Sequence, residues 1–197
     1  MRQPKVAADE VVRAAATLLA TQGPSALSAR RLATELGTST MTVYTHFGSM
    51  TDLVRAVVAE GFHQLDLHLE DLPVSDDPGA DLVAVARAYR ANGLKNPQLY
   101  AVMFGGIAGG TSPLTPADRR VGENSLTKLQ AAAQRAVAAG LLPEETHPWE
   151  HTRRMWAIAH GFVSLELAGL LGPPERAEAS FLAVVEALLA HHDESEG

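Results

Sequence analysis

The chain has 197 residues, of which 46% are hydrophobic, enough for one large domain or two small ones with a substantial core. It has no cysteine, which excludes disulfides, thiol nucleophiles and cysteine-ligated metal sites, and no apolar run approaches the roughly 20 residues that cross a bilayer. The net charge of −7 by itself argues against a nucleic-acid partner. We expect a soluble cytoplasmic protein with no membrane partner.

The charge is unevenly distributed along the chain. Residues 1–55 hold six basic and four acidic residues, a net of +2, whereas the remainder holds ten basic and nineteen acidic residues, a net of −9. This asymmetry favours contact between the front of the chain and a polyanion. The alternative is that +2 over 55 residues is ordinary scatter.

The first predicted element is a helix over residues 7–22, in which Val11, Ala15 and Leu18 recur at helical spacing. Gly23-Pro24 ends it. Two short helices follow, one over residues 28–36 and one over residues 40–47.

Capping residues mark the boundaries of these short helices. Ser28 can cap the first of them, and Gly37 supplies the left-handed exit that ends it. Ser49, with Asp52 three residues later, predicts the start of a longer helix over residues 49–72.

The second half of the chain is also helical in pattern, and no segment alternates as a strand does. The stretch DLPVSDDPG at 71–79 is the clearest linker. The sequence therefore predicts an all-α fold of about nine helices. The remaining helices are predicted at 80–92, 97–104, 116–139, 148–171 and 175–191.

Two short helices joined by a turn of about three residues that contains glycine make a helix-turn-helix, whose second helix enters the DNA major groove. The second helix lies in LGTSTMTVYTHF, residues 36–47. Its serine and threonine hydroxyls suit phosphate oxygens and base edges. Leu32, Leu36, Val43 and Phe47 can form the apolar core beneath it. The alternative is a threonine-rich, solvated helix edge.

Residues 11–58 resemble the N-terminal DNA-binding domain of the TetR family of transcriptional regulators, through the first helix, RRLATELG, TVYTHF and the start of the following helix. NPQLYAVMFGG and RMWAIAHGFVSLELAG resemble one branch of that family's core domains. The resemblance implies a helix-turn-helix domain over residues 1–48 and an effector-binding and dimerisation domain over 49–197, with 49–72 as the connecting helix. It further implies a homodimeric repressor, released from a palindromic double-stranded DNA operator by a small apolar or aromatic effector.

The resemblance also implies roles for individual residues in DNA binding. Arg30 matches a position that reaches a base in some members, and Ser28 can contact a phosphate. Base contacts are implied for Thr40, Met41 and Thr45, and phosphate contacts for Thr42, Tyr44 and His46.

Met50 departs from the family pattern, because many members have lysine at the start of this helix. Its presence removes a phosphate contact and predicts a shallower salt dependence of DNA binding. Arg2 and Lys5, on the leading arm, are candidates to compensate.

The resemblance places the effector pocket in the second half of the chain. Tyr100, Met103 and Phe104 would lie beside Trp156 and His160 and line a cavity with few polar groups. For each of these residues the alternative is ordinary core packing. Glu166 needs a partner if it is buried, and otherwise points to solvent.

Small residues recur along the helix predicted at 148–171, which is apolar nearly all round. Pairing this helix and the next with their two-fold mates would form a four-helix dimer interface, as in the TetR family. The alternative is that both faces belong to the intramolecular core. The interface residues would be Ala157, Gly161, Ser164, Ala168, Val185, Leu188 and Leu189.

Catalytic patterns are weak. GGIAGG lacks the GxGxxG order, and His147 and His151 lack the glutamate of a metalloprotease motif. We therefore expect no catalytic residue, cofactor or metal, and no enzyme activity. The alternative from a different class is a helical small-molecule-binding protein or enzyme with a vestigial DNA-binding head.

Overall fold

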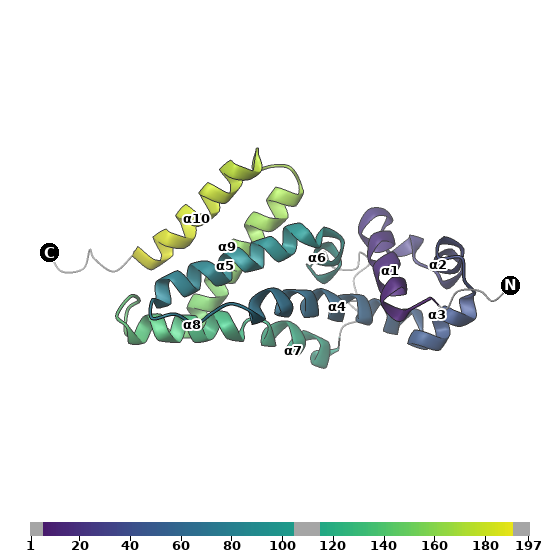
Figure 1. The fold of residues 1–197 in the computed structure, drawn as a ribbon, viewed down its shortest axis with the longest axis horizontal. Helices are drawn as coiled ribbons and strands as arrows, with labels where there is room; N and C mark the ends of the chain where they lie inside the picture. Colours follow the sequence, from purple (N-terminus) through teal and green to yellow (C-terminus); the bar gives the residue numbers. More distant parts are fainter. Residues whose placement is uncertain (1–5, 105–114, 191–197) are drawn as a thin grey trace. The chain divides into compact units, whose positions relative to one another are not determined.

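The computed structural model describes residues 6–104 and 115–190. Within these ranges the chain forms ten α-helices and one short 3₁₀ helix, with no strand (Figure 1). The all-α prediction is confirmed. None of the described helices is both long and apolar enough to span a bilayer.

The chain divides into two compact units. The first unit comprises Met1–Gln64 and Asn96–Gly122, and the second comprises Leu65–Lys95 and Glu123–Gly197. The helices α4 (Met50–Glu70) and α7 (Pro116–Asn124) therefore contribute residues to both units. The predicted boundary after residue 48 does not coincide with this division.

The first unit begins with α1 (Ala8–Gln22), a 3₁₀ turn (Pro24–Ala26), α2 (Ala29–Glu35) and α3 (Thr40–Phe47). Their apolar faces meet the first half of α4 in one core, to which α6 (Pro97–Phe104) adds Val102. Each large aliphatic side chain buried there stabilises the fold by about 1.5–3 kcal/mol. The most deeply buried of these side chains include Val11, Leu18, Leu32, Val43, Leu53 and Val57.

The turn between α2 and α3 is built as the sequence predicts. Gly37 has φ +61°, the left-handed conformation that glycine adopts without steric cost. Ser28 caps α2 by accepting a hydrogen bond from the Arg31 N–H at 3.3 Å. Ser49 accepts from the Asp52 N–H at 3.1 Å and donates to the Asp52 carboxylate at 2.6 Å, which confirms the predicted start of α4.

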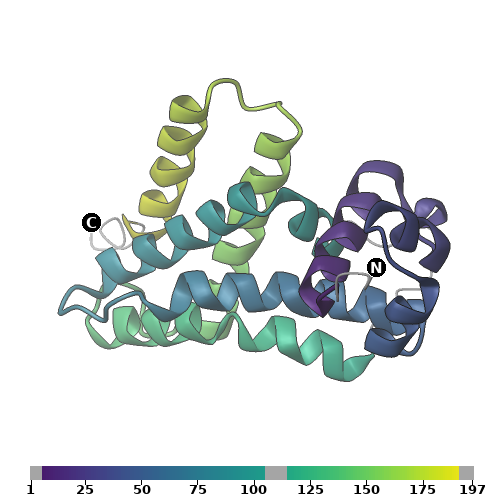
Figure 2. The ribbon, with the colours of Figure 1, turned by 45° about the vertical axis from the view of Figure 1, so that its right-hand side comes forward.

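The second unit contains α5 (Pro78–Lys95), α8 (Thr127–Ala138), α9 (Pro148–Leu167) and α10 (Pro174–Ala190). Helices α5, α8 and α9 pack on one another, and α9 and α10 form a hairpin (Figure 2).

The single helix predicted over 116–139 is two helices, α7 and α8, which explains the tenth helix among the described residues. The break follows Asn124, whose carbonyl accepts a hydrogen bond from the Thr127 hydroxyl at 2.7 Å. The Thr127 hydroxyl thus donates to a carbonyl oxygen that, in a continuous helix, would accept a hydrogen bond from a backbone N–H.

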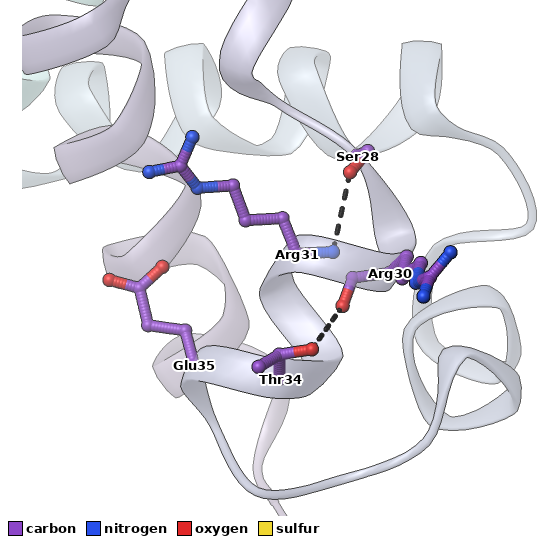
Figure 3. Close-up of a pocket in the computed structure, with 5 residues that line it drawn as sticks. All are labelled: Ser28, Arg30, Arg31, Thr34 and Glu35. Carbon is purple, nitrogen blue, oxygen red and sulfur yellow. Dashed lines mark hydrogen bonds between the residues drawn. The ribbon is translucent and has the colours of Figure 1, made fainter.

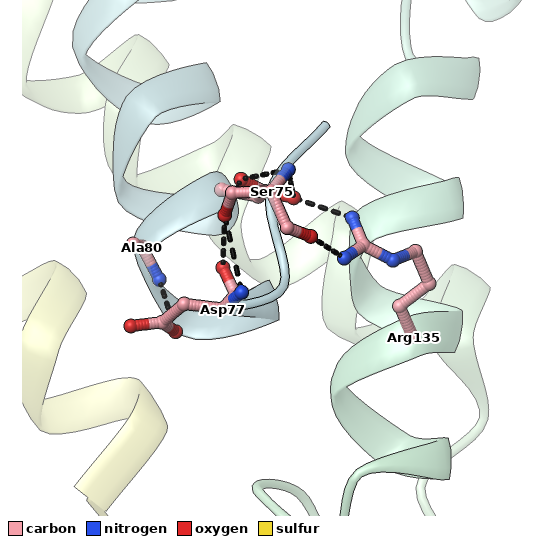
Figure 4. Close-up of polar contacts among 5 residues, drawn as sticks. Ser75, Asp77, Ala80 and Arg135 are labelled. Atoms are coloured by element: carbon pink, nitrogen blue, oxygen red, sulfur yellow. Dashed lines mark hydrogen bonds and ion pairs between the residues drawn. The ribbon is translucent and has the colours of Figure 1, made fainter. Parts of the chain in front are cut away.

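The predicted linker before α5 is fixed by polar contacts (Figure 4). The buried Asp81 carboxylate accepts from the Ser75 hydroxyl at 2.7 Å and from Arg135, which also donates to the Ser75 carbonyl. Burial alone would raise the pKa of Asp81, but the hydrogen bonds from Ser75 and Arg135 outweigh it and hold the pKa below its ordinary value. Asp81 is therefore ionised at neutral pH.

A buried ion pair joins α5, α9 and α10. The Arg90 guanidinium donates to both oxygens of Glu166, at 2.9 and 2.7 Å, and to Glu178 at 3.2 Å. The side chains of Arg90 and Glu166 are only 10% and 9% exposed. Glu166 is therefore a buried carboxylate with a partner, which resolves the question that the sequence left open.

Removing Arg90 should strongly destabilise the second unit. We expect Arg90→Met to lower the free energy of unfolding by about 3–5 kcal/mol, because it leaves the Glu166 carboxylate buried without a cation. Denaturant unfolding followed by circular dichroism measures the change. The matched control is Arg153→Met, whose exposed pair with Glu150 is worth less than about 1 kcal/mol. Equal losses in the two variants would contradict the role of Arg90.

Candidate nucleic-acid interface

The outer face of α3 is polar and largely exposed. Ser39 caps the helix by accepting from the Thr42 N–H at 3.2 Å, while Val43, only 1% exposed, anchors the inner face. Outward-facing Met41 and Tyr44 are 71% and 45% exposed. The exposed residues of α3 are Thr40, Met41, Tyr44, Thr45 and His46, all of them predicted DNA contacts.

The hydroxyl groups of α3 differ in availability. Thr42 is half-buried, and its hydroxyl lies 3.0 Å from that of Thr38 and 3.1 Å from that of Ser39, so it helps to hold the turn. Thr45 donates its hydroxyl to the Met41 carbonyl at 2.7 Å. The Thr40 hydroxyl has no hydrogen-bond partner among the described residues, which leaves it open to an outside group.

His46 makes a contact that the sequence did not predict. Its Nε2 lies 3.0 Å from the carbonyl oxygen of the buried Val6, so the ring donates this N–H to the backbone that precedes α1. Forty positions separate the two residues, and no local pattern signals such a contact. One ring nitrogen of His46 is thus used inside the protein.

An open groove lies along α2 beside the turn (Figure 3). Ser28 and Arg30, both exposed, are predicted DNA contacts, whereas Arg31 was not in the predicted set. The lining residues are Ser28, Arg30, Arg31, Thr34 and Glu35.

Met50 is half-buried and packs against the apolar core of the first unit. The position that carries lysine in many family members is therefore used for packing in this chain. Arg2 and Lys5, the candidates to compensate, lie outside the described residues.

The predicted effector residues fall in different units. Tyr100, Met103 and Phe104 belong to α6 of the first unit, where the Tyr100 and Phe104 rings lie 4.8 Å apart. Trp156 and His160 belong to α9 of the second unit. The pocket made from all five residues stays a prediction.

A cavity inside the second unit includes Trp156 but not His160. It is predominantly apolar, with no charged side chain in its lining, and the Trp156 indole N–H donates to the Tyr89 hydroxyl at 3.1 Å. Its free volume is about 20 Å³, on the order of one water molecule. The lining residues are Leu69, Val85, Ala86, Tyr89, Ser125, Leu126, Leu129, Met155, Trp156 and Ala159.

The small residues on α9 and at its C-terminal cap lie on a face that the described residues do not cover. Ala157, Ser164 and Ala168 are exposed, and a Cβ atom added to the half-buried Gly161 would meet nothing within 4 Å. This side of the helix is therefore exposed among the described residues, although the sequence of the helix is apolar nearly all round. Leu165, Leu167 and Leu170 are 44%, 39% and 70% exposed.

One predicted interface residue of α10 needs correction. Val185 is 1% exposed and belongs to the interior of its own unit, because its side of α10 faces inward. The neighbouring Val184 is 37% exposed and points outward instead. Leu188 and Leu189 are half-buried.

No cluster of three or more potential metal ligands occurs among the described residues. His147 is exposed, whereas His151 is 3% exposed. The His151 Nε2 is buried without a hydrogen-bond partner in the described part of the chain.

Comparisons with known proteins match both halves of the chain. Residues 11–57 match the family model described as bacterial regulatory proteins, tetR family, and residues 82–188 match a tetracyclin repressor-like C-terminal domain. An uncharacterized HTH-type transcriptional regulator of Mycobacterium tuberculosis, Rv0681, is 27% identical over 170 residues, which cover 86% of this chain and 74% of that protein.

Solved structures share the fold. The TetR family transcriptional regulator PfmR from Thermus thermophilus aligns with a TM-score of 0.75 and 22% identity, over 93% of this chain and 96% of that one. The regulator FadR from Bacillus subtilis, solved in complex with stearoyl-CoA, aligns with a TM-score of 0.79 and 15% identity, over 92% and 97% of the two chains.

Two histidines of α9, the buried His151 and the half-buried His160, predict acid sensitivity. Burial lowers the pKa of His151, which nearby Arg154 lowers further, and burial also lowers the pKa of His160. Below about pH 6.5 these histidines therefore bind protons in the unfolded chain more readily than in the folded chain. Their contribution to the free energy of unfolding is fully present above that pH and is lost as the pH falls toward the folded pKa values.

We expect His151→Leu to reduce this loss, measured as the free energy of unfolding between pH 7.5 and 5. The variant also removes an unsatisfied buried nitrogen, which costs about 1–3 kcal/mol. If the variant loses as much stability on acidification as the parent protein, the loss is caused by protonation of a group other than His151.

Proposed function

Because the chain belongs to the TetR family of bacterial transcriptional regulators, we propose that it acts as a homodimeric repressor that a small molecule releases from a palindromic operator. The observation that carries the proposal is the outer face of α3. An apolar inner face anchors this short helix while hydroxyl, phenol and imidazole groups face outward. Such a face fits a major groove, where these groups meet base edges and phosphates.

Dimerisation is supported by the outer face of the α9–α10 hairpin. Small residues on α9 allow a second helix to approach closely, and leucines beside them remain exposed in the single chain. Association removes this apolar surface from water. A two-fold dimer would present two α3 helices to half-sites about one turn, roughly 34–36 Å, apart.

The cavity of the second unit supports a small apolar or aromatic effector. Its lining has no charged group to bind an anion, and only Tyr89, Ser125 and Trp156 bring polar side-chain atoms. The acyl-CoA bound to FadR of Bacillus subtilis is a precedent for an apolar chain bound in this fold. Helices α4 and α7 have residues in both units. An effector that changes the conformation of the second unit can therefore change the conformation of the first unit and its affinity for DNA.

The test is binding to DNA fragments that tile the region upstream of the protein's own gene. We expect one fragment to bind far more tightly than shuffled DNA, with affinity falling steeply between about 50 and 200 mM salt because phosphate contacts release counterions. Absence of any sequence preference would instead favour the vestigial-head alternative.

Two variants in the same assay separate base contacts from backbone contacts. We expect Thr40→Ala to change the preferred base at one operator position, and Tyr44→Phe to weaken all sequences alike by about 1 kcal/mol through loss of a phosphate contact. If both variants weaken every sequence equally, Thr40 contacts the backbone.

A charge placed on the α9 face tests the dimer. We expect Gly161→Glu to shift the protein from dimer to monomer in sedimentation velocity, because a carboxylate would be buried between two helices. A Cβ atom added at this position meets nothing within 4 Å among the described residues, so the fold should be retained. Ala138→Glu, at an exposed position of α8, is the control that should remain dimeric. If the Gly161→Glu protein remains dimeric, the dimer interface lies elsewhere on the protein.

A further inference from the structure

We infer that Arg31, held in place by Gln22, makes a second DNA-backbone contact from α2, with its side chain directed away from that of Arg30. The inference rests on the proposed DNA-binding function and adds a residue pair that the family resemblance did not supply. Four observations support it: a hydrogen bond, the charge of its acceptor, the direction of two side chains and the packing of Met50.

The hydrogen bond joins two helices. The Arg31 guanidinium, in the first turn of α2, donates through Nη2 to the Gln22 side-chain oxygen at the end of α1, at 2.6 Å. Both residues are exposed. A long surface arginine normally loses side-chain conformational entropy when it binds a ligand. The bond to Gln22 already restricts the Arg31 side chain, so less entropy is lost when Arg31 binds.

The acceptor is neutral, which distinguishes Arg31 from other arginines in the described part of the chain. Ion pairs with carboxylates neutralise Arg13, Arg55, Arg90, Arg135 and Arg153. The Gln22 amide orients Arg31 without cancelling its charge. The other N–H donors of Arg31 have no partner among the described residues. An oriented, uncompensated guanidinium matches the geometry and charge of a phosphate.

One acidic group lines the same groove. Glu35 lies one helical turn after Arg31, and no ion pair between described side chains joins the two. Glu35 should therefore repel a phosphate that Arg31 attracts, and its removal should act in the opposite sense to the removal of Arg31.

Arg30 and Arg31 leave α2 in opposite directions (Figure 3). Arg31 is directed toward the end of α1, because Gln22 holds it there. The two guanidinium groups are thus suited to different positions on a duplex. Since Met50 is packed against the core, Arg31 supplies a cation that the start of α4 does not.

The experiment compares salt titrations of operator binding for the full-length protein and its variants. We expect Arg31→Gln to weaken all operator sequences by the same factor and to lower the slope of log K against log salt by about 0.9 per protomer. Arg31→Lys should restore most of the slope, because it retains the cation. Arg13→Gln, which removes an equal charge from an ion pair on α1, should leave the slope unchanged.

Two further variants test the arrangement around Arg31. Gln22→Glu should weaken binding with a reduced slope, because a carboxylate would neutralise Arg31, and Glu35→Gln should strengthen binding to all sequences. An unchanged slope in Arg31→Gln, or equal losses in Arg31→Gln and Arg13→Gln, would overturn the inference. Parent protein without sequence-specific binding would instead reject the proposed function.

Discussion

The interface depends on the burial of one side of two short helices. Helices α2 and α3 have seven and eight residues, which is too short to be stable alone. They persist because Leu32 and Val43, nearly without exposure, share a core with α1 and the first half of α4. Because the apolar side holds α3 in place, the opposite side of the helix does not need to pack against the rest of the protein. It is therefore free to carry short hydroxyl groups, which are mediocre helix formers.

Local chemistry explains why much of this arrangement could be predicted from sequence. Helix caps and left-handed turns depend on a few neighbouring residues, so Ser28, Gly37 and the Ser49–Asp52 pair could be recognised in the sequence. Contacts between distant residues leave no such pattern. The Arg90–Glu166 pair spans 76 positions and the His46–Val6 bond spans 40. The division of α7 from α8 is not evident from the sequence, because a threonine within a helical pattern does not show whether its hydroxyl will bond to the backbone.

Exposure, rather than composition, distinguishes the two sides of α9. The sequence of this helix is apolar nearly all round, a pattern typical of a helix that is buried on most faces. Among the described residues, the buried side of α9 is the one that carries His151, Met155 and Val163. The buried Arg90–Glu166 ion pair joins α9 to α5. Two buried charges are stable only when their hydrogen-bond geometry is good, so the pair fixes how the two helices pack. With the inner side packed in this way, the small residues of the outer side are already exposed in one chain, so that the proposed association would need little rearrangement.

The size of the cavity in the second unit constrains how an effector can act. A drug-sized ligand needs a pocket of roughly 300–1,000 Å³, whereas the free volume here is about 20 Å³. An effector bound in this cavity, as proposed, would have to separate side chains that are now in contact, among them those of Trp156 and Tyr89. Such an effector would bind an opened form far better than the closed one, and a large difference in affinity between two forms is what shifts their populations. In a repressor of this design, the closed cavity would belong to the form that binds DNA.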